Sequence, residues 1–254
     1  MSVCAVGDKT RIKALFDGWQ ETLIYSCLEG HMGEAYTCDA YENKAALLIV
    51  GDFCYFAGEA CRELVQYPGA AQDPCFRILV PQNACWERLI EEVYPFRAAK
   101  RVRYAIKKEP DVFKPDELER WADAAPSGIV LQNIDRPVYE QVMAQGWSRD
   151  LCSQFRDYED YAARGIGIAA LYKGTVVGGA SSYTVYDGGI EIEIDTREDY
   201  RRRGIATACG ARLILECIKR GLYPSWDAQN KWSAALAEKL GYHFDREYTV
   251  YELS

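Results

Sequence analysis

The segment Asp199-Tyr-Arg-Arg-Arg-Gly-Ile-Ala206 constrains the fold of this chain more than any other stretch. It follows an alternating apolar and polar run, residues 189–196, which predicts a strand. It also opens a segment in which apolar residues recur at helical spacing from Ile205 to Cys217. Such a strand–loop–helix unit points successive backbone amides at one spot, and the helix start adds roughly half a positive charge. An anion, above all a phosphate, is therefore the expected occupant of the loop.

The spacing Arg201-x-x-Gly204-x-Ala206 has a physical reason. Gly204 and Ala206 lack bulk, so a diphosphate can approach the backbone at the start of the helix. Arg201, Arg202 and Arg203 supply cationic side chains around it. For this motif alone, a helix start with a solvated basic cluster is the simpler interpretation, and a second motif downstream favours the phosphate site.

The second motif is Pro224-Ser-Trp-Asp-Ala-Gln-Asn230, followed by a predicted helix that ends near Gly241-Tyr242. Asn230 is a good N-cap, and Gly241 stands where a left-handed C-cap belongs. Three apolar residues fall on one face of this helix: Trp232, Leu236 and Leu240. Taken alone, the segment predicts a well-capped helix and nothing more.

Together, the strand, the arginine loop, the long helix, a short strand and the Asn230-capped helix resemble the GNAT superfamily of N-acetyltransferases, which bind acetyl-coenzyme A (acetyl-CoA). The segments Tyr-Pro-Ser-Trp-Asp-Ala and Leu-Ala-Glu-Lys-Leu-Gly-Tyr are similar to those of a bacterial GNAT subfamily with an additional N-terminal half. The detailed resemblance covers about half of the chain, from about residue 125 onward.

These patterns predict an α/β (α+β) protein with two domains. Residues 125–254 form the GNAT domain, with a mixed, mostly antiparallel central sheet. Its predicted order is a strand, two helices, three antiparallel strands, a helix, a strand, a helix and a strand. Residues 1–124 form a smaller α/β domain, which the resemblance suggests is a degenerate GNAT-like half, although no internal repeat is visible. The run 107–116, with two prolines, is the predicted linker.

Local signals place the elements of the N-terminal half. Apolar periodicity predicts one helix over residues 8–28, and a second helix over 86–94 is capped by Asn83. The remaining predictions are a hairpin over 45–57 that turns at Gly51-Asp52, a short helix over 59–66, and strands over 76–80 and 103–107.

The resemblance also implies how acetyl-CoA binds. The strand that ends at Thr196 would run beside the pantetheine arm, residues 201–207 would hold the diphosphate, and Asn230 would reach the pantetheine or the acetyl region. The implied cofactor-binding residues are Ile194, Thr196, Arg201, Arg202, Arg203, Gly204, Ile205, Ala206, Thr207, Asn230 and Ser233.

Members of this superfamily usually transfer the acetyl group directly to an amine, and a carboxylate can take the amine proton. Glu191, Glu193 and Asp195 alternate along the strand before the arginine loop, so they should share one face. The resemblance nominates Glu193 or Glu191 as the base, with Asp227 behind them. Alternating acids are also what any half-exposed strand shows.

One position departs from the family pattern. Many GNAT enzymes place a proton-donating tyrosine where this chain has Ala237. Tyr242, Tyr223 or a water molecule would replace it, or coenzyme A would leave as a thiolate without a general acid.

Two functions follow from the resemblance. The first is an acetyl-CoA-dependent N-acetyltransferase that acts on a primary amine of a small molecule or peptide. The alternative is a non-catalytic acyl-CoA-binding module that serves regulation or interaction. Acidic residues near the predicted cleft mildly favour a cationic acceptor, such as a polyamine, an aminoglycoside-like antibiotic or a lysine side chain.

Composition excludes several other classes. A net charge of −8 argues against nucleic acid as a partner, and no apolar run or signal-peptide pattern predicts a membrane or secreted protein. Ten cysteines occur without a Cys-x-x-Cys pair, and the two histidines stand apart from them, so no metal site is predicted. We therefore expect a cytoplasmic protein with reduced thiols, and a homodimer as the default assembly.

Overall fold

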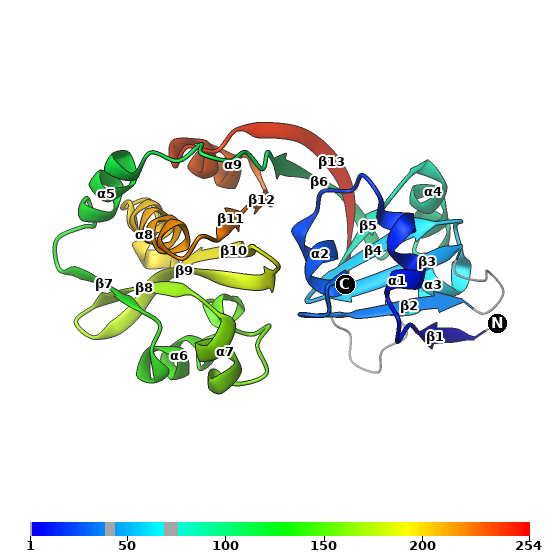
Figure 1. Cartoon of the computed structure of the whole chain (residues 1–254), viewed down its shortest axis with the longest axis horizontal. Helices are drawn as coiled ribbons and strands as arrows, with labels where there is room; N and C mark the ends of the chain where they lie inside the picture. The colour runs from blue at the N-terminus through cyan, green and yellow to red at the C-terminus, as the bar shows by residue number, and fades with distance from the viewer. Residues whose placement is uncertain (1, 39–43, 69–75) are drawn as a thin grey trace. The chain divides into compact units, whose positions relative to one another are not determined.

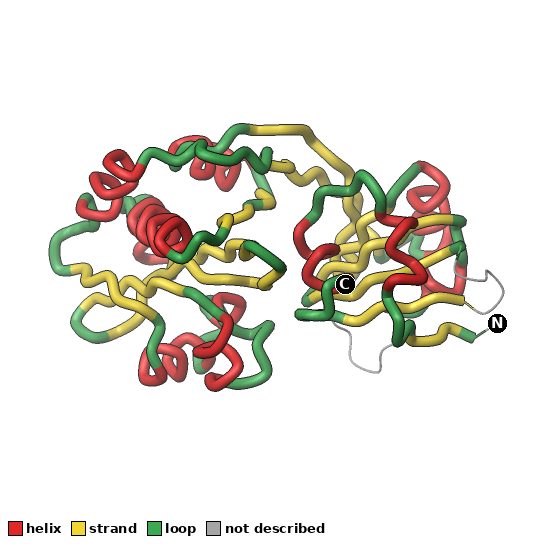
Figure 2. The backbone as a smooth tube through the Cα atoms, viewed as in Figure 1, coloured by secondary structure: helices red, strands yellow, loops and turns green. Residues whose placement is uncertain are grey.

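The computed structural model describes residues 2–38, 44–68 and 76–254, and it divides into two compact units (Figures 1 and 2). The first unit comprises Met1–Arg103 and Glu247–Ser254, and the second comprises Tyr104–Arg246. The boundaries fall inside β6 (Ala98–Ile106) and β13 (Phe244–Leu253), so each of these strands continues from one unit into the other. The predicted domain boundary at residues 124 and 125 lies within the second unit, after α5 (Pro115–Asp123).

The first unit is built on one mixed sheet. Its strands run in the order β1-β2-β3-β4-β5-β13-β6, with β4 and β5 parallel and the pairs from β1 to β4 antiparallel. The strands not yet given bounds are β1 (Val3–Ala5), β2 (Glu34–Cys38), β3 (Ala45–Val50), β4 (Phe53–Gly58) and β5 (Arg77–Pro81). Its helices are α1 (Thr10–Lys13), η1 (Ala14–Phe16), α2 (Thr22–Leu28), α3 (Arg62–Gln66) and α4 (Ala84–Val93).

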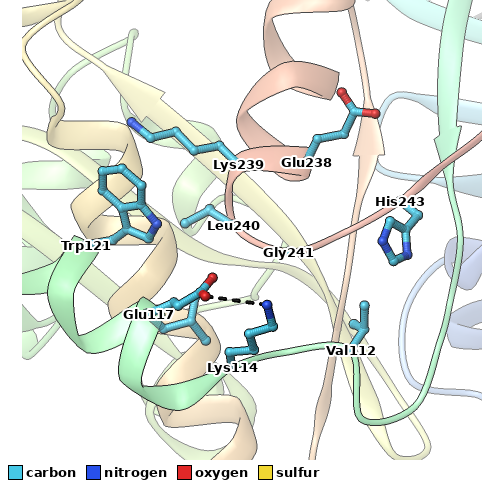
Figure 3. A pocket seen from close by; sticks show the side chains of 10 residues that line it. Val112, Lys114, Glu117, Trp121, Glu238, Lys239, Leu240, Gly241 and His243 are labelled. Atoms are coloured by element: carbon cyan, nitrogen blue, oxygen red, sulfur yellow. Dashed lines mark hydrogen bonds and ion pairs between the residues drawn. The ribbon is translucent and has the colours of Figure 1, made fainter.

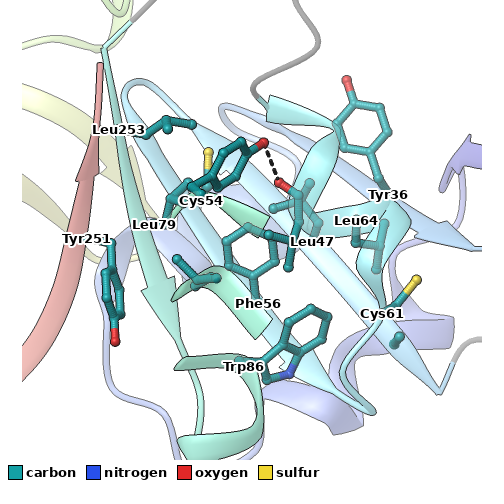
Figure 4. Close-up of a cluster of buried hydrophobic side chains, with 14 of the residues drawn as sticks. Tyr36, Leu47, Cys54, Phe56, Cys61, Leu64, Leu79, Trp86, Tyr251 and Leu253 are labelled. Carbon is teal, nitrogen blue, oxygen red and sulfur yellow. Dashed lines mark hydrogen bonds between the residues drawn. The ribbon is translucent and has the colours of Figure 1, made fainter. Parts of the chain in front are cut away.

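The core of the first unit lies where α3 and α4 pack on this sheet (Figure 4). Trp86 is fully buried, its ring centroid lies 5.2 Å from that of Phe56 in a tilted arrangement, and its Nε1 donates to the carbonyl of Gly58 at 3.0 Å. Asn83 positions this tryptophan, because its Oδ1 accepts from the amides of Cys85 and Trp86 and so fixes the first turn of α4. The Asn83 cap and the hairpin at Gly51-Asp52 are confirmed.

The prediction of one helix over residues 8–28 is wrong. The chain forms α1, η1 and α2 in its place, because Gly18 takes a positive φ of 79° that no helix continues. Strands β1 and β2 were not predicted. These strands are short, and β2 holds its place by pairing with β3, a contact that its own pattern does not reveal.

The second unit contains a five-stranded sheet in the order β11-β10-β9-β8-β7. Its strands are β7 (Ile129–Asn133), β8 (Gly167–Tyr172), β9 (Thr175–Tyr186), β10 (Gly189–Thr196) and β11 (Tyr223–Ser225). All pairs are antiparallel except β10 with β11, which is parallel. The predicted mixed, mostly antiparallel sheet is therefore confirmed.

Helices cover both faces of this sheet (Figure 1). On one face lies α8 (Ile205–Lys219), and α5 packs against it. The other face carries η4 (Arg149–Leu151), α6 (Arg136–Met143) and α7 (Tyr158–Arg164). Two adjacent glycines of β9 point to opposite faces of the sheet. A Cβ on Gly178 would meet Ile205 of α8, whereas a Cβ on Gly179 would meet Leu151 of η4.

Two global expectations can be compared with the structure. The cysteines of the described residues are all free thiols, and Cys75 lies outside those residues. Throughout the described ranges, none of the helices combines the length and the apolar character that a membrane crossing requires.

Candidate functional site: the splayed strands and the start of α8

Strands β10 and β11 part in the middle of the second unit. They pair in parallel from Gly189 with Tyr223 to Glu191 with Ser225, and β11 then ends. The chain continues into β12 (Asp227–Ala228), which pairs with β6 instead, while β10 runs on to Thr196. Among the described strands, residues 192–196 of β10 therefore pair only with β9. Their second edge offers backbone donors and acceptors to an extended ligand.

The arginine loop continues from this open edge into α8. Arg202 and Gly204 both adopt positive φ, 61° and 88°, and Gly204 is the N-cap residue of the helix. The first intrahelical bond runs from the amide of Ala208 to the carbonyl of Gly204 at 3.0 Å. Within residues 2–38, 44–68 and 76–254, no protein group accepts from the amides of Gly204 to Thr207. These amides at the positive end of a helix form a binding place for an anion.

The three arginines of the loop are exposed, and each contacts a different part of the unit. Arg201 donates from Nε to the carbonyl of Thr196 at 3.0 Å, which ties the loop to the end of β10. Arg202 lies 5.8 Å from the ring of Trp232, and Arg203 lies 5.1 Å from the ring of Tyr200. The aromatic contacts hold two guanidinium groups at the loop without neutralising them.

The acids of β10 share the face that is opposite to α8, as the alternation predicts. Ile194 lies on the α8 side, because its Cδ1 would be 3.2 Å from a Cβ on Gly210. Glu191 is only 6% exposed, at the closed end of the splay, whereas Glu193 is half-buried and pairs in register with Ser181 of β9. Asp227 follows Ser225, the register partner of Glu191, by two residues. The strand thus offers one enclosed and one more accessible glutamate.

At the start of α9 (Lys231–Lys239), the polar side chains form hydrogen bonds with other groups of the protein. Asn230 Oδ1 accepts from the amides of Trp232 and Ser233, both at 3.0 Å, as the N-cap prediction requires. The Ser233 hydroxyl accepts from the indole of Trp226 at 3.1 Å. These two residues therefore fix the helix start that faces the arginine loop through Trp232.

Neither tyrosine considered as a replacement for the missing general acid is well placed for that task. Tyr242 is 2% exposed and donates to the carbonyl of Pro224 at 2.6 Å. The Tyr223 hydroxyl donates to the carbonyl of Lys107 and accepts from the amide of Glu109. Burial raises the pKa of both hydroxyls, and Ala237 is itself fully buried. Of the alternatives to a tyrosine as general acid, this leaves a water molecule or departure of coenzyme A as a thiolate without an acid.

Comparison with protein families supplies the deciding observation, because the model of the GNAT acetyltransferase family matches residues 13–251. The chain belongs to the GNAT acetyltransferase family. This confirms the superfamily that the loop and the α9 motif predicted, and it extends the match over the N-terminal half.

Individual relatives of this GNAT chain agree. A GCN5-related N-acetyltransferase-like protein from Streptococcus suis 89/1591 is 45% identical, with a TM-score of 0.92 over 97% of this chain and 98% of its own. The uncharacterized N-acetyltransferase YdfB of Bacillus subtilis (strain 168) is 30% identical over 94% of each chain. A GCN5-related N-acetyltransferase from Kribbella flavida, 16% identical with a TM-score of 0.55 over 83% of this chain, supports the fold alone.

Gly178 and Trp232 both lie at the start of α8, and neither position was predicted from the sequence. Gly178 lets the first turn of α8 approach β9, because a Cβ there would lie 2.7 Å from Cγ2 of Ile205. The signal was available, since a Gly-Gly pair inside a strand marks a close backbone approach. Trp232 was assigned to an apolar helix face, but it is 78% exposed beside Arg202, whereas Ala234 and Ala237 are buried.

A pocket of about 310 Å³ in the same unit contains none of the predicted GNAT site residues (Figure 3). It lies between α5 and the end of α9, where Lys239 sits 4.1 Å from the Trp121 ring and Lys114 pairs with Glu117. Its lining side chains carry both signs of charge. The pocket is therefore separate from the start of α8.

Asp195, the third acid of β10, makes stability depend on pH. Burial raises the pKa of Asp195, and the negative charge of Asp150 raises it further. The hydrogen bond from the amide of Thr196 and the positive charge of Arg201 both lower this pKa, but burial has the larger effect. Because the pKa of Asp195 is higher in the folded state, this carboxyl makes its whole contribution to the free energy of unfolding below the ordinary pKa, about 3.9. It is lost as pH rises through the raised folded-state value.

We therefore expect Asp195→Asn to raise the Tm at neutral pH, with a difference that shrinks toward zero near about pH 3. Differential scanning calorimetry across this range measures it, and Glu198→Gln, an exposed acid nearby, controls for net charge. A variant that melts lower than the parent at neutral pH would mean that the contact with Arg201, 4.0 Å away, outweighs burial.

Proposed function

We propose that this chain transfers the acetyl group of acetyl-CoA directly to a primary amine of a small molecule or peptide. Family membership supports acetyl transfer, and the amine acceptor is our inference. The observation that carries the proposal is the start of α8, whose amides from Gly204 to Thr207 have no protein acceptor within the described ranges and adjoin three arginines. A diphosphate fits this combination of oriented amides and cationic side chains.

The residues proposed to hold acetyl-CoA lie along one path through the second unit. The amides and side chains of the loop would bind the diphosphate, and the open edge of β10 after Glu191 would accept the amide groups of the pantetheine. The proposed set is Ile194, Thr196, Arg201, Arg202, Arg203, Gly204, Ile205, Ala206, Thr207, Asn230 and Ser233. When bound, acetyl-CoA supplies an activated thioester.

The chain must also remove a proton from the acceptor, since an alkyl ammonium group has a pKa near about 10.4. We assign this role to Glu193 because it is half-buried on the strand that borders the open edge. Glu191 is nearly enclosed, and Asp227 lies on β12, so they stand as the second and third choices. Glu193 would take the proton as the amine nitrogen attacks, directly or through one water.

The contacts of Tyr223 and Tyr242 favour departure of coenzyme A without a protein acid. Both hydroxyls are held by backbone groups, and Ala237 has no hydroxyl. The positive end of α8 and the arginines would stabilise the bound anionic product.

The same observation supports a second candidate, a non-catalytic acyl-CoA-binding module. The two are separated by purified protein, acetyl-CoA and a panel of amines that includes polyamines, aminoglycosides and lysine peptides, monitored for free thiol. Release of thiol that depends on the amine supports the transferase. Micromolar binding of CoA by calorimetry without turnover on any amine supports the module, and absence of binding removes both.

Given an active amine, Glu193→Gln should lower kcat/KM by roughly a hundredfold or more at neutral pH. The loss should shrink in alkaline buffer, where more of the amine is already free base. Glu191→Gln serves as the matched control, one strand repeat away on the same face. An unchanged rate for Glu193→Gln together with a large loss for Glu191→Gln would transfer the role to Glu191.

A further inference from the structure

Three side chains of metal-ligand type meet in the first unit, at the end of β2 and the start of α3. Cys38 ends β2, Cys61 is the N-cap residue of α3, and Glu63 lies in its first turn. The two sulfurs and one carboxylate oxygen all lie within 4.8 Å of one another. Both cysteines are fully buried, Glu63 is half-buried, and Cys61 Sγ donates to Glu63 Oε2 at 3.3 Å.

A purely apolar role for these thiols explains the cluster less well. Cys54 is equally buried in the same core, yet among the described residues it belongs to no such group of ligand atoms (Figure 4). Cys61, in contrast, lies at the side of the core away from Tyr251 and has a carboxylate as its hydrogen-bond partner. Glu63 is partly exposed, so the carboxylate of the cluster borders solvent while the two sulfurs are buried.

We propose that Cys38, Cys61 and Glu63 form a site for a thiophilic divalent cation of the Zn²⁺ class. Zn–S and Zn–O bonds of about 2.3 and 2.1 Å place two ligands of one ion roughly 3.5 Å apart, close to the observed contact between Cys61 and Glu63. Two sulfurs and one oxygen form the set that such ions prefer, and a water molecule would complete the tetrahedron.

Binding at this site exchanges two thiol protons for one divalent cation. The cation forms two bonds to sulfur and one to oxygen, each thiol releases its proton, and the three anionic ligands leave the complex with one net negative charge. Cys61 holds its proton in the hydrogen bond to Glu63, so the ion must displace that proton. This cluster could not be predicted from the sequence, because the separation between residues 38 and 61 is far larger than metal-ligand spacing.

The test is a titration of the reduced full-length protein with Cd²⁺ alone, followed by thiolate-to-metal absorption in the ultraviolet. Cys85 is exposed, so Cys85→Ser is the parent for all variants. We expect one Cd²⁺ per chain, loss of the absorption in Cys38→Ser and in Cys61→Ser, and full retention in Cys54→Ser. Glu63→Gln, at a partly exposed position, should weaken the affinity roughly tenfold or more.

Several outcomes would overturn the proposal. One is absence of the absorption in the parent, and another is equal loss in Cys54→Ser. If the cysteine variants do not fold, an unchanged Cd²⁺ affinity for Glu63→Gln rejects the site. Peptide mapping of air-oxidised protein covers the remaining interpretation: a Cys38–Cys61 disulfide, together with no Cd²⁺ binding after reduction, identifies a redox pair in place of a metal site.

Discussion

Replacing Gly204 with valine is expected to weaken the binding of coenzyme A about a hundredfold or more. Gly204 holds φ at 88° and ψ at 0°, a left-handed conformation that a β-branched residue strongly avoids. The loop must then leave the conformation that directs its amides toward one point. Each charge-assisted hydrogen bond contributes about 1.5–3 kcal/mol, so losing two accounts for this factor.

Isothermal calorimetry with coenzyme A measures this effect, and Gly188→Val provides a matched control. Gly188 has nearly the same φ, 85°, and like Gly204 has no atom within 4 Å of an added Cβ. It lies in the turn between β9 and β10, away from the loop. Both variants should lose similar stability, and only Gly204→Val should lose affinity. Normal binding by Gly204→Val would show that another part of the chain holds the diphosphate.

The largest expected change in stability comes from Trp86→Ala, which should destabilise the first unit by about 3–5 kcal/mol. Trp86 is completely buried against Phe56, and its indole is bonded to the carbonyl of Gly58. The substitution leaves a large cavity and removes the hydrogen-bond partner of that part-buried carbonyl.

Urea denaturation followed by far-UV circular dichroism gives the comparison, with Trp232→Ala as the control. Trp232 is 78% exposed, so its removal should change the free energy of unfolding by less than about 0.5 kcal/mol. It should instead alter the environment of Arg202 at the phosphate loop. Equal destabilisation by the two tryptophan variants would contradict the assignment of Trp86 to the core.

Features that depend on neighbours in the sequence were predictable. Asn83 and Asn230 stand before helices and cap them through their own side chains, and the Gly51-Asp52 turn joins two adjacent apolar runs. The arginine loop was readable for the same reason, because a strand, a glycine and a helix start follow one another within the chain.

Features that depend on distant partners were not predictable. The end of β11 at Ser225 opens β10, but nothing at Ser225 shows that the next residues pair with β6. Trp232 is apolar and correctly spaced for a core face, and only the packed structure shows that Ala234 and Ala237 fill that face. Cys38 and Cys61 meet because α3 packs against β2, and β2 was not predicted.

Strand β13 imposes an order on biosynthesis. Its residues Tyr251 to Leu253 pair with β5, and two of them enter the core of the first unit. The ribosome makes these residues only after the whole of Tyr104–Arg246. The first unit therefore cannot complete its sheet until the end of the chain has been translated. The second unit, Tyr104–Arg246, is translated in full before that point.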